Sequence, residues 1–121
     1  MKLGNVKANI VSIQNAEHYT WGARCDGWFL LKEEDMHVIQ ERMPAGTAEK
    51  PHYHKRSRQF FYVLRGELTI ELAGEALRMR EGEGLEIGPG AVHQAHNNSN
   101  NDTEFVVVSC PPSRDDRTNL E

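Results

Sequence analysis

The sequence lacks any long apolar run, and stretches such as Phe105–Val108 end after a few residues. A membrane-spanning helix needs about 20 predominantly apolar residues, so no such helix is expected. Residues 1–5 also contain no apolar block of the kind that a secretory signal peptide carries. We therefore expect a cytoplasmic protein that does not have a membrane as its partner.

Cysteine is scarce as well, with only Cys25 and Cys110 among 121 residues. No Cys-x-x-Cys pair is present, so neither a zinc ribbon nor thioredoxin-type redox chemistry is indicated. Without an export signal, the two cysteines are expected to be free thiols in a reducing compartment. The sequence assigns no further role to either of them.

The sequence also has no excess of basic residues. Its 14 Lys and Arg residues against 18 Asp and Glu residues give a formal net charge of −4. Binding to a nucleic-acid backbone requires clustered Lys and Arg, so nucleic acid is not an expected partner. A Gly-x-Ser-x-Gly elbow and a Walker sequence are absent, and no helical pattern follows Gly82-x-Gly84 as a dinucleotide-binding loop requires.

What the sequence does contain is a series of short β-prone segments, about 8–12 residues apart, with Gly and Pro between them. This spacing predicts an all-β sandwich or barrel, and the missing helical segments argue against a parallel α/β sheet. The expected strands are residues 7–14, 27–31, 36–43, 59–64, 68–72, 76–80, 85–87, 92–97 and 104–109.

The length is that of one domain, residues 1–121. We expect N-terminal strands within 6–31, a core over about 34–110, and a charged C-terminal tail at 113–121 that forms an arm or is partly disordered.

Two of the six histidines stand two positions apart, in the sequence His52-Tyr53-His54. Side chains at i and i+2 of a strand point to the same face, so both imidazoles could meet one metal ion. The amide oxygen of Gln59 could add a ligand, and His93 could close the site from a distant strand. An isolated His-x-His pair is more often two surface imidazoles, so the residues around the pair decide its interpretation.

Those residues resemble the two motifs of the cupin superfamily. The first motif runs from Gly46 through His52, His54 and Gln59 to Gly66, and the second from Gly82 through Pro89-Gly90 and His93 to Asn97. The resemblance implies a small antiparallel jelly-roll barrel that holds one divalent transition metal ion, Fe, Mn, Ni or Zn. The ligands that it implies are His52, His54, Gln59 and His93. It also implies a homodimer, because small cupins commonly pair.

Two positions depart from the family pattern. Gln59 stands where the family usually has glutamate, and Gly88 where it usually has proline. The turn at Gly88 can still form. An amide oxygen is neutral, so the metal would keep its full charge, bind more weakly and favour an anionic ligand. Gln59 also cannot serve as a general base.

Strand phase suggests a pocket beside the metal, and each candidate is equally well explained as a core residue. The pocket candidates are Trp28, Met43, Phe61 and Ala95. On the opposite face of the same strand as Phe61, Phe60 and Tyr62 would either line a dimer interface or pack between sheets.

The resemblance leaves three functions open. The first is a metal-dependent dioxygenase, isomerase or lyase acting on a small, anionic metabolite. The second is a non-catalytic module that binds or senses a small molecule such as a sugar or an acid. The third, a structural cupin with a vestigial site, is disfavoured because unpaired buried imidazoles lower stability. No dedicated acid–base pair is apparent that would select one reaction.

Overall fold

Eleven strands build the part of the chain that the computed structural model describes, residues 8–120. Within this range there is no helix, and hence none that could span a membrane. The strands are β1 (Glu17–Trp21), β2 (Cys25–Lys32), β3 (His37–Met43), β4 (His52–Tyr53), β5 (Arg58–Arg65), β6 (Leu68–Leu72), β7 (Glu75–Met79), β8 (Gly84–Ile87), β9 (His93–His96), β10 (Thr103–Cys110) and β11 (Thr118–Asn119).

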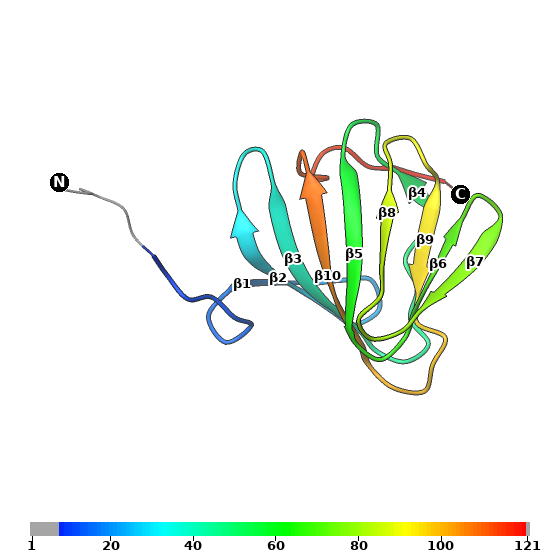
Figure 1. Cartoon of the computed structure of the whole chain (residues 1–121), viewed down its shortest axis with the longest axis horizontal. Helices are drawn as coiled ribbons and strands as arrows, with labels where there is room; N and C mark the ends of the chain where they lie inside the picture. Colours follow the sequence, from blue (N-terminus) through cyan, green and yellow to red (C-terminus); the bar gives the residue numbers. More distant parts are fainter. Residues whose placement is uncertain (1–7, 121) are drawn as a thin grey trace.

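The strands form two antiparallel sheets that face each other (Figure 1). One sheet has the order β1-β2-β3-β10-β5-β8, and the other has the order β11-β4-β9-β6-β7. Strands distant in sequence lie side by side: β10 pairs with both β3 and β5, and β9 pairs with both β4 and β6. This crossing pattern is that of a jelly roll, and it confirms the predicted all-β fold.

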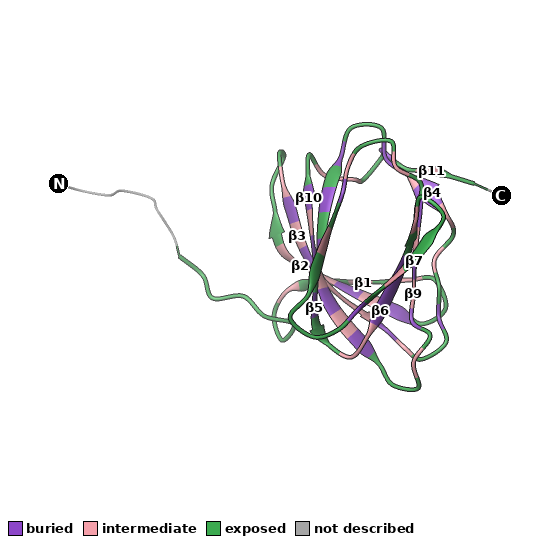
Figure 2. Cartoon of the chain, turned by 45° about the vertical axis from the view of Figure 1, so that its right-hand side comes forward, coloured by how far each residue is buried: buried purple, intermediate pink, exposed green. Residues whose placement is uncertain are grey.

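The core fills the space between the sheets because strand residues alternate between two faces. On β5, Phe61 and Val63 are buried, whereas Phe60 and Tyr62 are 44% and 42% exposed. Figure 2 shows buried segments on strands of both sheets. The outward phase predicted for Phe60 and Tyr62 is therefore confirmed, and packing between the two sheets is excluded for them.

The N-terminal segment differs from the expectation. The predicted strand at 7–14 is wrong for residues 8–14, which form no strand, and Lys7 lies outside the described residues. A turn forms instead, because Ser12 N–H donates to Asn15 Oδ1 at 2.9 Å and Ala16 N–H donates to the Ser12 carbonyl at 2.9 Å. Ile10 is 94% exposed, so the apolar residues here cover no sheet.

The C-terminal tail also differs, because it folds back onto the barrel instead of forming an arm. We call residues 113–120 the C-terminal strap. Within it, β11 pairs with β4, and Asp116 is buried. The Asp116 carboxylate accepts hydrogen bonds from three consecutive backbone amides, those of Lys55, Arg56 and Ser57, at 2.9, 3.0 and 2.9 Å. The strap thereby fixes the loop that follows β4.

The turns at Gly66 and Gly74 allow a matched test of how closely the connections between strands are packed. Gly66 and Gly74 have φ values of +84° and +81°, but a Cβ at Gly66 would lie 2.7 Å from the Asp102 carbonyl oxygen, whereas Gly74 faces open space. We expect Gly74→Ala to lower the free energy of unfolding by about 1 kcal/mol, and Gly66→Ala by about 2–3 kcal/mol, because only Gly66 adds a clash to the left-handed backbone. Chemical denaturation measures both losses, and equal losses would contradict the packing at Gly66.

Candidate metal centre

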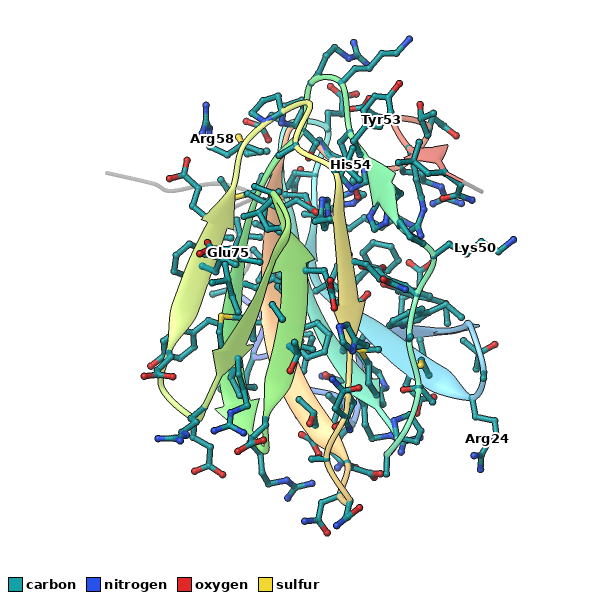
Figure 3. The ribbon with its side chains drawn as sticks, turned by 90° about the vertical axis from the view of Figure 1, so that its right-hand side faces the viewer. Arg24, Lys50, Tyr53, His54, Arg58 and Glu75 are labelled. Atoms are coloured by element: carbon teal, nitrogen blue, oxygen red, sulfur yellow. The ribbon has the colours of Figure 1, made fainter. Side chains whose placement is uncertain are left out.

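Three histidines from two neighbouring strands meet inside the barrel. His52 lies in β4, His54 directly follows it, and His93 begins β9 opposite His52. One ring nitrogen of each lies within 4.8 Å of the other two, and the residues are only 2%, 4% and 2% exposed. In Figure 3, His54 lies at the end of the barrel near the strap, whereas Lys50 extends outward. The two motifs quoted from the sequence therefore do come together in space.

Each of the three rings is held by a backbone carbonyl oxygen at its Nδ1. The distances are 2.8 Å from His52 to Lys50, 2.5 Å from His54 to Asp116, and 2.9 Å from His93 to Ala91. A carbonyl oxygen can only accept a hydrogen bond, so Nδ1 carries the proton and Nε2 keeps a free lone pair. Metal-binding histidines are commonly oriented in this way by a partner on the other ring nitrogen.

Several polar atoms at this point have no partner within residues 8–120. His54 Nε2, His93 Nε2 and Gln59 Oε1 are all buried without a hydrogen bond. Gln59 Nε2 donates to Ser109 Oγ at 3.0 Å, which leaves its oxygen as the unsatisfied atom. Buried polar atoms are nearly always paired, so a missing group is indicated. Imidazole nitrogens with an amide oxygen fit a divalent transition metal ion.

The electrostatics keep the imidazoles in their neutral form. Burial lowers the pKa of His52 to about 3, against a weaker opposing effect of its backbone hydrogen bond. Burial also lowers the pKa of His54 and His93, and the positive charge of Arg117 lowers all three further. Neutral imidazole is the form that binds a metal, so no proton need leave these side chains near pH 7.

A cavity of about 280 Å³ adjoins this cluster, and His52, His54 and Gln59 contribute to its wall. Two of the pocket candidates from the sequence, Phe61 and Ala95, line it as well. Its remaining wall comes from β1, β3, β10, the C-terminal strap and Glu49 in the loop before β4. The cavity is therefore shared between both sheets and is bordered by a segment that lies outside the cupin motifs.

The other two pocket candidates lie elsewhere. Met43 is fully buried in the hydrophobic core and does not line the cavity. Trp28 stacks on His18 with ring centroids 5.3 Å apart and lies on the outer face of its sheet. The phase of β2 explains this position, because Gly27, not Trp28, faces the cavity-lining Tyr19.

The polar residues that line the cavity but were not predicted from the sequence are Tyr19, Glu41, Glu49, Ser109, Ser113, Arg114, Asp115 and Arg117. The Tyr19 hydroxyl donates to Glu41 Oε2 at 3.0 Å. Burial raises the pKa of Glu41 to about 8, and the negative charge of Glu49 adds to this effect. Burial likewise raises the pKa of Glu49 to about 7. The cavity thus combines carboxyl groups with guanidinium groups beside the histidine cluster.

Comparison with known protein families places this geometry in context. Residues 39–109 match the family described as "Cupin domain". An uncharacterized protein from Aquifex aeolicus (strain VF5) is 35% identical over 74 residues, which are 61% of this chain and 60% of that protein. The match therefore spans less than two thirds of the length of this relative.

Solved structures show the same fold at low sequence identity. KdgF from a Halomonas species superposes with a TM-score of 0.79 at 19% identity, covering 89% of this chain and 98% of KdgF. The polyketide cyclase RemF from Streptomyces resistomycificus also gives a TM-score of 0.79, at 17% identity, covering 95% of this chain and 87% of RemF. One of these barrels is thus named for an enzyme activity.

Proposed function

The chain belongs to the cupin family, and on this basis we propose that it is a metal-dependent enzyme for a small anionic metabolite. The ligands of its divalent transition metal ion are His52, His54, Gln59 and His93. The reaction class is that of a dioxygenase, isomerase or lyase. The observation that carries this proposal is the convergence of unpaired, buried Nε2 and Oε1 atoms at one edge of a cavity.

The charge around the cavity supports an anionic substrate. All four proposed ligands are neutral, so a divalent ion would keep its full charge and could polarise a carboxylate or carbonyl oxygen. Arg114 and Arg117 of the C-terminal strap line the same cavity. The positive charge of Arg117 also lowers the pKa of the nearby histidines, although burial lowers it more. These residues would attract an anion and orient it toward the histidines.

The homodimer remains a prediction. The outer face of β5 exposes three large apolar side chains, those of Phe60, Tyr62 and Leu64, at 44%, 42% and 43%. Neighbouring apolar side chains on an exposed face are typical of protein–protein contact sites, which supports pairing through this face.

Gln59→Glu tests the charge argument. We expect the variant to bind Zn²⁺ about tenfold more tightly, because a carboxylate adds a negative ligand, and to bind pyruvate about tenfold more weakly in its metal-loaded form. Competition with a chelator gives the first affinity, and calorimetry gives the second. Pyruvate is a suitable probe because it is a small anion with both a carboxylate and a carbonyl.

Gln14→Glu is the matched control, because it adds the same charge at an exposed position outside the cavity. It should leave both affinities at the wild-type value. If Gln59→Glu behaved like this control, Gln59 would not be a ligand. If metal-loaded wild-type protein failed to bind pyruvate, the anionic substrate would be the wrong class.

A further inference from the structure

A tyrosine and a glutamate outside the cupin motifs lie side by side in the wall of the cavity. Tyr19 comes from β1 and Glu41 from β3, and the Tyr19 hydroxyl donates to Glu41 Oε2 at 3.0 Å. Both line the cavity that His52, His54 and Gln59 also line. They lie outside residues 46–97, which contain both cupin motifs, and neither is needed as a metal ligand. The metal site therefore does not explain why these two residues line the same cavity.

The two glutamates that line the cavity differ in how many of their carboxylate oxygens have a partner. Glu49 Oε2 accepts the Ala95 N–H at 3.0 Å, and its Oε1 lies 3.7 Å from Arg117 Nη1. Glu41 Oε2 accepts the hydrogen bond from the Tyr19 hydroxyl. Within residues 8–120, Glu41 Oε1 has no hydrogen-bond partner, and it is not fully buried. Glu41 is the group with an oxygen open to a ligand.

We propose that Glu41 is the catalytic acid–base residue of this cavity and that Tyr19 positions it, acting on a small keto carboxylate with a hydrogen next to its carbonyl. Glu41 takes the place of the acid–base glutamate that the chain lacks at Gln59. The inference rests on the proposed function, because the same cavity must hold the anion.

The proton transfer needs no further reactant. Glu41 Oε1 removes a proton from the carbon beside the carbonyl, and the electron pair of the broken C–H bond stays on the substrate as an enolate. The protonated Glu41 then returns a proton to carbon, which restores the carboxylate. Tyr19 keeps the second carboxylate oxygen in place during both steps. In an isomerase, the proton would return to a different carbon.

A raised pKa suits this role. Burial and the charge of Glu49 hold the pKa of Glu41 near 8, whereas the Tyr19 hydrogen bond and the charge of Arg117 lower it. A base is most effective when its pKa lies close to the working pH. Besides these three side chains, the titratable or charged groups that line the cavity with Glu41 are His52, His54, Arg114 and Asp115.

The test is exchange of the pyruvate methyl hydrogens with D₂O, followed by proton NMR on metal-loaded protein. Glu41→Gln should slow the exchange at least about 100-fold, Glu41→Asp should restore part of it, and Glu75→Gln, the same change at an exposed site on β7, should have no effect. Metal content and pyruvate affinity, measured on the same samples, should stay at the wild-type value in all three variants.

Tyr19→Phe tests whether Tyr19 positions Glu41, and the measured quantity is the titration midpoint of the Glu41 carboxyl group. In metal-free protein with carbon-13 in its glutamate carboxyl groups, the titration midpoint of Glu41 should rise when the Tyr19 hydroxyl is removed, because that hydrogen bond favours the charged form. A merely structural tyrosine would leave the midpoint unchanged. This readout does not depend on turnover.

The outcomes separate the two proposals. If the wild-type protein binds pyruvate but its methyl hydrogens do not exchange, the role of Glu41 is overturned. The same holds if Glu41→Gln exchanges them at the wild-type rate. Either result leaves the proposed metal and anion site intact. No binding of pyruvate contradicts the proposed function first and removes the basis for this role with it. An unchanged Glu41 midpoint in Tyr19→Phe overturns the role of Tyr19 alone.

Discussion

His93→Ala is expected to lose the bound metal almost completely while the barrel still folds. His93 supplies the one imidazole of the cluster that comes from β9, and within residues 8–120 its Nε2 has no hydrogen-bond partner. Without it, only the imidazoles of His52 and His54 and the neutral amide of Gln59 remain, so affinity for Zn²⁺ should fall by about 100-fold or more. Elemental analysis after dialysis measures the loss.

Folding should survive this change, because losing the hydrogen bond from His93 Nδ1 to the Ala91 carbonyl is offset in part by removing Nε2, which is buried without a partner within residues 8–120. The metal-free variant is therefore expected to unfold close to the metal-free wild type. Added Zn²⁺ should raise the melting temperature of the wild type but not that of the variant, since an ion stabilises only the state that binds it.

His96→Ala is the matched control, because His96 lies on the same strand with the opposite phase and outside the cluster. Equal metal content in the two variants would exclude His93 as a ligand.

Asp116→Asn is expected to have the second largest effect, on stability and on metal binding together. Its carboxylate accepts three backbone N–H groups of the loop after β4, and its own carbonyl accepts His54 Nδ1. An amide presents one oxygen and one NH₂ group to these three donors, so about 2–3 kcal/mol of unfolding free energy should be lost. Freed from its loop contacts, the strap should hold His54 less well, and metal affinity should drop about tenfold or more.

Asp35→Asn provides the comparison, because it removes the same charge from an exposed residue outside the cavity. Denaturant unfolding and Zn²⁺ titration of the two variants separate the loss of charge from the loss of the amide contacts. If both variants lost the same stability and affinity, the strap would not be what orients His54.

Local spacing was sufficient to predict an all-β fold and the shared face of His52 and His54, whereas the jelly-roll barrel and the full histidine cluster were predicted from the resemblance to the cupin motifs. Period-two alternation assigned the faces of β5, and His52 and His54 share a face for the same reason. Their meeting with His93 followed from the resemblance to a known pair of motifs. No local property of the sequence would have paired β4 with β9.

Features that depend on distant contacts were missed. Asp116 belongs to a charged stretch that resembles an arm, and its burial becomes clear only when the amides some 60 residues earlier are in place. Glu41 gave a weak indication, since it alternates with the buried Ile39 and Met43 on a strand face that should be apolar. A charged residue in phase with core residues can mark a functional cavity, as Glu41 does in this barrel.

The most direct test of the account is a crystal structure of protein loaded with one metal, with anomalous diffraction data collected at the absorption edge of that metal. We expect one ion per chain, with Nε2 of His52, His54 and His93 at about 2.0–2.1 Å and Gln59 Oε1 facing it. An ion bound at any other histidine, or no anomalous peak among these three rings, would contradict the metal centre on which the proposed function depends.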